Sequence, residues 1–235
     1  MTTVYLVPSV LAPDATETIP AYVLDAVKNC QVIFAENERT ARRFLKSLDR
    51  NIVIDDFEWY AIHKAENDLL NQFREKIREN RNIAIISEAG CPGVADPGQV
   101  LVQAAQEMNC IIRPLVGPSS ILLALMASGM NGQQFEFVGY LPIDHTERSK
   151  KLKELETSSA KQNSTKIFIE TPYRNNQLLD SIITNCNGET KLCIASNITD
   201  AGEQIITRSI SYWKKNKPEL HKQPAIFLLF AGNSH

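Results

Sequence analysis

The segment from Ile86 to Gly98, which reads ISEAGCPGVADPG, decides the fold class of this chain. It follows an apolar run that begins at Ile83 and precedes a helical pattern, so it joins a strand to a helix. Its glycines and prolines favour tight turns, and glycine lets another molecule approach the backbone closely. It has neither the Lys-Ser/Thr of a Walker loop nor the GxGxxG spacing of a dinucleotide-binding turn. It is therefore either a plain connection or the backbone of a polar ligand site.

Outward from this segment, strand-like and helix-like runs alternate through the first half of the chain. The expected strands are residues 4–7, 32–35, 52–54, 83–87 and 111–115. Strands that are apolar throughout and separated by helices predict a largely parallel sheet covered on both faces. Ligands of such sheets bind beyond the carboxyl ends of the strands. The loops to inspect therefore follow Val7, Ala35, Ser87 and Leu115.

The second half has a different pattern, with short strands expected at 135–141, 167–170, 192–196, 204–207 and 225–230. A helix is expected near 148–156, and residues 157–165 are expected to form a surface loop because they are polar. More of these strands should be antiparallel, in a mixed sheet. The predicted fold class is α/β, with two α/β domains. The N-terminal domain, residues 1–115, has a largely parallel five-stranded sheet, and residues 116–235 have a mixed sheet.

Three further segments combine strand ends with polar side chains. Residues 115–120, LVGPSS, place Ser119 and Ser120 near a helix start, where hydroxyls cap free amides and the amides favour an acceptor. Residues 35–40, AENERT, bring a carboxylate and an arginine to the end of the second strand. Residues 169–175, IETPYRN, bring a carboxylate, an arginine and an aromatic ring to the end of a strand in the second half, and the ring could stack on a base. Each has a purely structural alternative: a helix cap, a solvated helix start or a simple turn.

Composition limits the possible partners. Lys and Arg number 25 and Asp and Glu 27, a formal charge of −2, so no global positive field drives non-specific nucleic-acid binding. Contact with RNA must come from local basic patches, such as residues 39–46 or 148–153, and DNA is not expected as a partner. The near-neutral charge favours a structured assembly over naked RNA.

Cysteine usage and hydropathy bear on compartment and metal content. Five cysteines, an odd number with no metal-ligand spacing, argue against a disulfide framework and a metal site. No apolar run approaches the roughly 20 residues that a membrane-spanning helix needs, and the N-terminus lacks the pattern of a signal peptide. We expect a cytoplasmic protein without a membrane partner.

Six segments together resemble the tetrapyrrole-methylase-like (class III) S-adenosylmethionine-dependent methyltransferases. They are AENERTARRFL at 35–45, ISEAGCPGVADPG at 86–98, PLVGPSSILLALMASG at 114–129, FEFVGYLP at 135–142, FIETPYR at 168–174 and KQPAIFLLF at 222–230. Within that superfamily they are most similar to the bacterial small-subunit ribosomal RNA (cytidine-2′-O-)-methyltransferase family. The chain departs from the family pattern in its first loop, from Pro8 to Asp14, which has no glycine, and so resembles a short divergent branch.

The resemblance implies two α/β domains with S-adenosylmethionine in the cleft between them, usually in a homodimer. By matching segments, it also implies a set of cofactor-binding residues: Pro8, Ala89, Gly90, Cys91, Gly93, Val94, Ser119, Ser120, Thr171, Asn197, Pro224 and Ala225. We expect Glu36 and Glu88 to act on the acceptor hydroxyl as base or charge-stabilising group. Arg39 and Arg174 would hold RNA phosphate.

The implied activity is 2′-O-methylation of a ribose in ribosomal RNA, acting on the RNA or the small ribosomal subunit. Two alternatives stay open at this stage. The same fold could methylate a tetrapyrrole or a protein side chain. The glycine-free first loop also allows a module that binds S-adenosylmethionine without catalysis.

Overall fold

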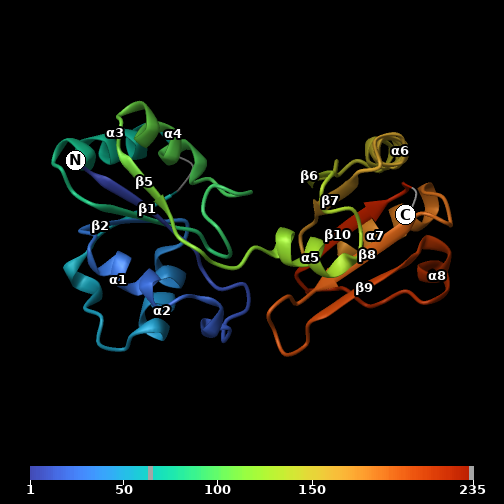
Figure 1. Cartoon of the computed structure of the whole chain (residues 1–235), viewed down its shortest axis with the longest axis horizontal. Helices are drawn as coiled ribbons and strands as arrows, with labels where there is room; N and C mark the ends of the chain where they lie inside the picture. Colours follow the sequence, from blue (N-terminus) through green and yellow to red (C-terminus); the bar gives the residue numbers. More distant parts are fainter. Residues whose placement is uncertain (63–65, 233–235) are drawn as a thin grey trace. The chain divides into compact units, whose positions relative to one another are not determined.

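The computed structural model of the chain describes residues 1–62 and 66–232. The chain divides into two compact units, Met1–Ser119 and Ser120–His235, and each is described by itself (Figure 1). We call them unit 1 and unit 2. In the region that the structure describes, no helix is long and apolar enough to cross a membrane.

Unit 1 contains one five-stranded sheet in the order β3-β2-β4-β1-β5. Every neighbouring pair in it is parallel, as the first half of the sequence predicts. The strands are β1 (Thr3–Val7), β2 (Val32–Ala35), β3 (Glu58–Ala61), β4 (Ile83–Ile86) and β5 (Ile111–Pro114). The helices are α1 (Tyr22–Lys28), α2 (Glu38–Leu48), α3 (Glu66–Arg78) and α4 (Gln99–Glu107), with short 3-10 turns at Thr16–Thr18 and Ile54–Asp56.

Helices cover both faces of this sheet, α1 and α2 on one side and α3 and α4 on the other (Figure 1). Successive side chains of a strand point to opposite faces, so each buried strand supplies two cores. In β2, Ile33 packs in the α1–α2 core, whereas Phe34 packs in the α3–α4 core. This explains why β2 and β4 are apolar at every position.

The prediction of a strand at residues 52–54 is wrong, because the third strand, β3, lies at Glu58–Ala61. The apolar run is only three residues long, and Ile54 begins a 3-10 turn with two aspartates. β3 is an edge strand whose residues are all half-buried, so it lacks a continuous apolar pattern. Its Glu58 is matched by Lys76 and Arg81, at 3.0 and 3.1 Å.

Unit 2 contains a second five-stranded sheet in the order β6-β7-β10-β8-β9. β6 pairs parallel with β7, and the other three pairs are antiparallel, which confirms the predicted mixed sheet. The strands are β6 (Phe135–Tyr140), β7 (Thr165–Ile169), β8 (Lys191–Ser196), β9 (Gln204–Ser209) and β10 (Ala225–Phe230). The helices are α5 (Ser120–Ser128), α6 (His145–Gln162), α7 (Asn175–Asn185) and α8 (Ile210–Lys215).

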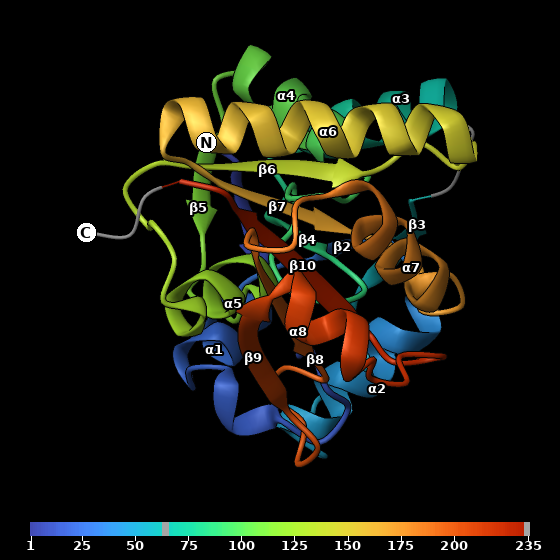
Figure 2. The ribbon, with the colours of Figure 1, turned by 90° about the vertical axis from the view of Figure 1, so that its right-hand side faces the viewer.

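Helix α6 is much longer than the sequence predicts and packs against β7 and β10 (Figure 2). The surface loop expected at residues 157–165 is wrong, since the helix continues to Gln162 and β7 begins at Thr165. The polar run misleads because Ser159 is fully buried, where its hydroxyl donates to Ser164 O at 2.7 Å and accepts from Ala231 N at 2.9 Å. A buried hydroxyl with both partners costs little.

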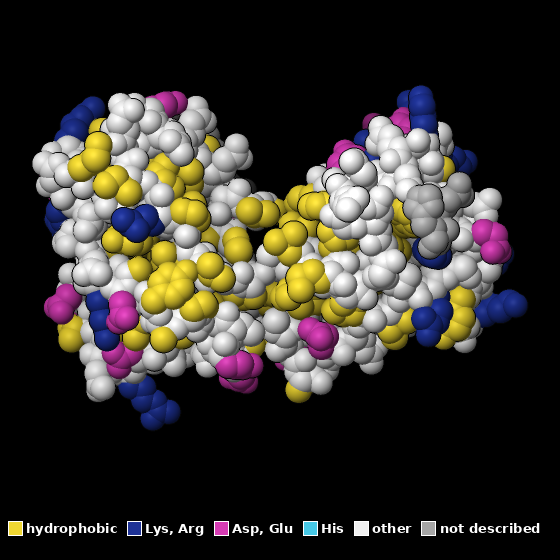
Figure 3. Space-filling view, viewed as in Figure 1, with side chains coloured by type: hydrophobic (Ala, Val, Ile, Leu, Met, Phe, Trp, Pro, Cys, Tyr) yellow, Lys and Arg dark blue, Asp and Glu magenta, His cyan; other side chains and the backbone are white. Residues whose placement is uncertain are grey.

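Helix α5 is apolar around its whole circumference and packs against β9 and β10. Ala124 and Leu125 are buried, whereas Leu122 and Met126 are 51% and 78% exposed. Hydrophobic side chains accordingly gather over α5 on the face drawn in Figure 3. The short helix α8, which the sequence analysis missed, inserts the buried Trp213 into the core of unit 2.

Candidate functional site

The loops that follow β1 and β4 are tied together at the carboxyl edge of the first sheet. Ser9 and Gly90 form an isolated antiparallel bridge, with N–H···O distances of 2.9 and 3.1 Å. The Ser9 hydroxyl donates to Ser87 O at 2.8 Å, and the Ser87 hydroxyl donates to Gly90 O at 2.8 Å. Sequence reasoning missed these two buried serines. The feature that could have identified them is a serine within two residues of the end of an apolar strand. Three of these hydrogen bonds hold the glycine-rich loop against the first loop, and the fourth, from the Ser87 hydroxyl, closes a turn within the glycine-rich loop.

The loop after β5 packs against the same two loops. A Cβ on Gly117 would lie 2.2 Å from Pro8 Cβ, so only glycine allows this approach. Gly90 has φ +73°, and a Cβ there would lie 3.5 Å from Pro118 O. The Cys91 thiol also points at this loop, with its Sγ 3.5 Å from Pro118 O. The structure thus brings together Pro8, Gly90 and Cys91 from the predicted set, directly beside Ser119.

The turn within the glycine-rich loop depends on Asp96, a residue that the sequence analysis did not single out. Its Oδ1 accepts hydrogen bonds from Gly93 N at 2.9 Å and Gly98 N at 2.7 Å. Burial raises the pKa of Asp96, although both hydrogen bonds oppose this shift. The Asp-Pro-Gly order at 96–98 is a turn signature that could have identified it.

Glu36 joins the loop after β2 to this cluster. Its Oε2 accepts a hydrogen bond from Glu88 N at 3.0 Å. Burial raises the pKa of Glu36 above its ordinary value, the negative charges of Asp96 and Glu88 act in the same direction, and the Glu88 N–H opposes them. Glu88 itself is exposed and holds Glu36 through its backbone. A half-buried carboxylate with a raised pKa is a better proton acceptor than an exposed one.

Other predicted residues of unit 1 lie at the surface. Ala89 and Val94 are exposed on the glycine-rich loop, and Arg39 is exposed on the first turn of α2. Tyr22 of α1, another residue that sequence reasoning missed, supports the loop after β5 because its hydroxyl accepts a hydrogen bond from Val116 N at 2.7 Å.

The remaining predicted cofactor residues belong to unit 2, at one edge of its sheet. Asn197 follows β8 with φ +51°, and its N–H donates to Pro224 O at 3.0 Å. Ala225 opens β10 opposite Ser196. Thr171 comes two residues after the end of β7, which pairs with β10 on its other side. The strand ends at Thr171, Asn197 and Pro224 are therefore neighbours, whereas Ser120 is the first residue of α5.

Arg174, which was expected to hold phosphate, is already paired. Its guanidinium donates to Glu170 Oε1 at 2.7 and 3.0 Å, and the Glu170 side chain is only 2% exposed. The same carboxylate oxygen accepts from Thr171 N at 2.7 Å. The arginine therefore orders the start of α7 by neutralising a buried acid.

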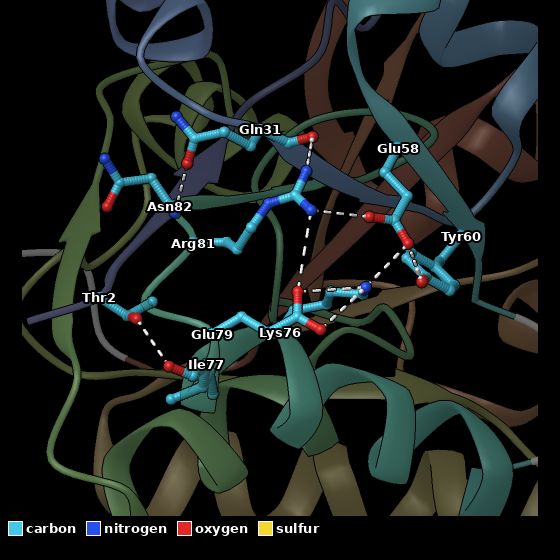
Figure 4. Close-up of polar contacts among 9 residues, drawn as sticks. All are labelled: Thr2, Gln31, Glu58, Tyr60, Lys76, Ile77, Glu79, Arg81 and Asn82. Carbon is cyan, nitrogen blue, oxygen red and sulfur yellow. Dashed lines mark hydrogen bonds and ion pairs between the residues drawn. The ribbon is translucent and has the colours of Figure 1, made fainter.

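A polar network at the opposite edge of the first sheet has a structural role. It lies where the strands begin and centres on Glu58, Lys76 and Arg81 (Figure 4). Glu58 also accepts the Tyr60 hydroxyl, and this hydrogen bond, with those from the cations, lowers the pKa of the carboxyl group. Every charge in it has an opposite partner, so it ties α3 to the edge strand β3.

Metal ligation has no support in the described part of the chain, where no group of three or more His, Cys, Asp or Glu side chains could hold a metal ion. All five cysteines are free thiols.

Comparison with known proteins identifies relatives over most of the chain. It is 30% identical over 204 residues to the "Ribosomal RNA small subunit methyltransferase I" of Micromonospora olivasterospora, covering 87% of this chain and 62% of that protein. The proteins of the same name from Synechocystis sp. and Vibrio cholerae are 29% and 31% identical, with 89% and 77% of this chain and 71% and 60% of theirs covered. The chain thus spans about two thirds of the length of these relatives.

Solved structures share the fold at low sequence identity. The methyltransferase CobJ superposes with a TM-score of 0.64 at 18% identity, covering 97% of this chain and 93% of CobJ. The uroporphyrin-III C-methyl transferase of Thermus thermophilus, complexed with S-adenyl homocysteine, gives 0.59 at 12% identity, covering 98% of this chain and 97% of its own. The family model for tetrapyrrole (corrin/porphyrin) methylases matches residues 3–211. The match covers most of both units, and the chain belongs to this methylase family.

Proposed function

We propose that this chain is an S-adenosylmethionine-dependent methyltransferase that methylates a ribose 2′-hydroxyl in small-subunit ribosomal RNA. The observation that carries the proposal is that the loops after β1, β2, β4 and β5 contact one another at one edge of the sheet. There the half-buried Glu36 is hydrogen-bonded to the glycine-rich loop. The family membership supports the methyl transfer, and the printed names of the relatives support the RNA acceptor.

The loop cluster has the chemistry that S-adenosylmethionine needs. When bound, this cofactor supplies a methyl group on a positively charged sulfonium. Gly90 and Gly117 let three loops approach one another closely. The carboxylates of Glu36 and Asp96 add negative charge to the glycine-rich loop, where Glu36 accepts from Glu88 N and Asp96 accepts from Gly93 N and Gly98 N. Pro8, Gly90, Cys91 and Ser119 would hold the cofactor in unit 1.

We also propose that Thr171, Asn197, Pro224 and Ala225 of unit 2 contact the cofactor. The support is their shared position at neighbouring strand ends. The positive φ of Asn197 ends strand β8 there and begins a turn. Ala89, Gly93, Val94 and Ser120 complete the proposed set. The homodimer, the ribosomal partner and the cytoplasmic location stay predictions.

Glu36 is the proposed base for the ribose hydroxyl. A ribose hydroxyl is a poor nucleophile, and a positioned base contributes about 10²–10⁴-fold to such a step. Burial raises the pKa of Glu36, which makes its carboxylate a stronger proton acceptor, and the Glu88 N–H fixes one of its oxygens. Glu88 is thus a positioning residue in this scheme, and Arg39 lies three residues from Glu36 to meet a phosphate.

The test is methyl transfer from labelled S-adenosylmethionine to small ribosomal subunits isolated from a strain that lacks the gene, with the product ribose mapped by mass spectrometry. Glu36→Gln should lower the transfer rate about 10²-fold or more when it is measured at saturating S-adenosylmethionine, so that a change in cofactor affinity does not enter the comparison. Glu38→Gln is the matched control, because Glu38 lies on the same segment but pairs with Arg42 at 3.3 Å. Full activity of Glu36→Gln would remove Glu36 from the proposed role.

A tetrapyrrole acceptor is the second candidate, favoured by the family name and by the similar solved structures. Incubating the protein with a porphyrinogen under the same conditions distinguishes the two. Methylation of the macrocycle without any labelling of RNA would replace the RNA proposal, and binding of the cofactor without transfer to either would indicate a non-catalytic module.

A further inference from the structure

One face of α2 carries a concentrated positive charge. Four basic residues in eight, Arg39, Arg42, Arg43 and Lys46, fall at positions i, i+3, i+4 and i+7 and therefore share one side of the helix. We call them the α2 basic stripe. The opposite side of the helix is buried in the core of unit 1 through Ala41, Phe44 and Leu45.

The charge of the stripe is largely uncompensated. Across residues 1–62 and 66–232, the ion pair that involves it is Arg42 with Glu38, at 3.3 Å. Lys46 donates to the backbone oxygen of Arg50 at 3.0 Å and also acts electrostatically on Asp49. Asp49 is already bound by Lys28 at 2.9 Å. In a chain with a net charge of −2, the stripe is therefore a local excess of positive charge.

The stripe is also held in place. Asn37 caps the helix by accepting a hydrogen bond from Thr40 N at 3.2 Å. The Arg42 guanidinium lies 4.7 Å from the centre of the Trp59 ring, whose indole N–H donates to Ile54 O at 3.0 Å. A guanidinium fixed over an aromatic ring retains its charge and loses less entropy when it binds an anion.

The position of the stripe relates it to the proposed reaction. α2 begins two residues after Glu36, so its first turn starts at the loop cluster of unit 1. The stripe from Arg39 to Lys46 extends about 10 Å along the helix at 1.5 Å per residue. One nucleic-acid strand carries a charge roughly every 3.4 Å of helix axis, so this length matches about three phosphates.

We propose that the α2 basic stripe binds the sugar–phosphate backbone that flanks the reacting ribose. This inference rests on the proposed function, because it takes RNA as the acceptor. The rival surface is α6, where Lys151 pairs with Glu154 at 4.0 Å and acidic residues alternate with the other lysines. Helix α6 therefore presents a mixed surface, and α2 a basic one.

The experiment compares two matched double variants in the full chain. Arg43→Gln with Lys46→Gln removes two charges from α2 without touching Arg39 or Arg42. Lys150→Gln with Lys153→Gln removes two exposed charges at the same spacing from α6. Binding of a fluorescein-labelled RNA hairpin is measured by anisotropy at several NaCl concentrations, without cofactor, and circular dichroism melts confirm that both variants fold.

Each phosphate contact contributes about 0.7–0.9 to the slope of log affinity against log salt. Losing two contacts should reduce the slope of the α2 variant by about 1.4–1.8. When the salt concentration rises from roughly 50 to 200 mM, the wild type should therefore lose about 7- to 12-fold more RNA affinity than the α2 variant. The α6 variant should keep the wild-type slope. Equal slopes in all three proteins, or equal flattening in both variants, would overturn the inference.

Methyl transfer to ribosomal subunits, measured in parallel, separates this inference from the proposed function. Ribose methylation by wild type together with an unchanged slope in the α2 variant refutes the stripe alone. A flattened slope without any ribose methylation refutes the proposed function and leaves α2 as a phosphate-binding surface.

Discussion

Gly117→Ala tests whether the loops after β1 and β5 meet as closely as the proposed cofactor site requires. A Cβ at position 117 would lie 2.2 Å from Pro8 Cβ and 2.3 Å from Pro8 Cγ. Carbon atoms in ordinary contact are about 3.5–4.0 Å apart, so one loop must move by more than about 1 Å. Overpacking of this kind costs about 1–3 kcal/mol, which for a chain of this size lowers Tm by roughly 2–12 °C.

The assay is thermal unfolding together with calorimetric titration of S-adenosylmethionine. Gly117→Ala should lose both stability and cofactor affinity, because the displaced loop carries Ser119 and faces the Cys91 thiol. Gly132→Ala is the control, since nothing lies within 4 Å of a Cβ at that position. Pro8→Gly in the Gly117→Ala background removes the two clashing carbon atoms and should restore part of the stability. A Gly117→Ala protein as stable and as tightly binding as wild type would refute the contact between the two loops.

Substitutions at two further positions, Glu36 and Asp96, test the charges and hydrogen bonds of the loop cluster. Because burial raises the pKa of Glu36, its stabilising contribution is present below the unfolded pKa and lost as pH rises through the folded one. Glu36→Gln should therefore raise Tm at neutral pH and leave it unchanged below about pH 4, and a wild-type protein that is the more stable of the two at pH 7 would contradict this. Asp96→Ala leaves Gly93 N and Gly98 N without their acceptor and should cost about 1–3 kcal/mol in urea unfolding, whereas Asp96→Asn should recover most of it. Equal losses in the two Asp96 variants would show that the carboxylate charge, rather than the hydrogen bonds, holds the turn.

Strands buried on both faces were predicted well because their burial leaves a direct mark on the sequence. β2 was predicted residue for residue, and the resemblance to the methylase family and the α/β fold class are both confirmed. Edge strand β3 was missed because half-buried positions accept Glu58 and aromatic residues as readily as aliphatic ones. The C-terminal part of α6, residues 157–162, was missed because Ser159 is buried through hydrogen bonds and not through apolarity.

The sequence predicted where the loops of the candidate site lie, but it did not predict which of their charged side chains form ion pairs. Strand ends located the loop cluster, since parallel strands bring their carboxyl ends to one edge. Whether a charged side chain can bind a ligand depends on whether another side chain of the protein already pairs with it. The sequence does not show which of several possible partners it contacts. Arg174 is bound by Glu170, whereas Arg39, Arg43 and Lys46 lack a carboxylate in ion-pair contact among the described residues. The pairing of Arg174 therefore favours α2, which contains the predicted Arg39, for the phosphate-binding role that we propose.

The acidic side of the loop cluster favours a cationic ligand. Glu36 and Asp96 are both partly buried, both have raised pKa values, and neither has an ion-pair partner among the described side chains. Such an arrangement destabilises the free protein, because like charges repel and burial disfavours ionisation. A bound positive charge offsets both effects, and the sulfonium of S-adenosylmethionine carries one where its demethylated product does not. In the proposed site these carboxylates would therefore favour the reactant cofactor over the product, and the basic residues of α2, which we propose to bind RNA phosphates, lie on the helix that follows Glu36.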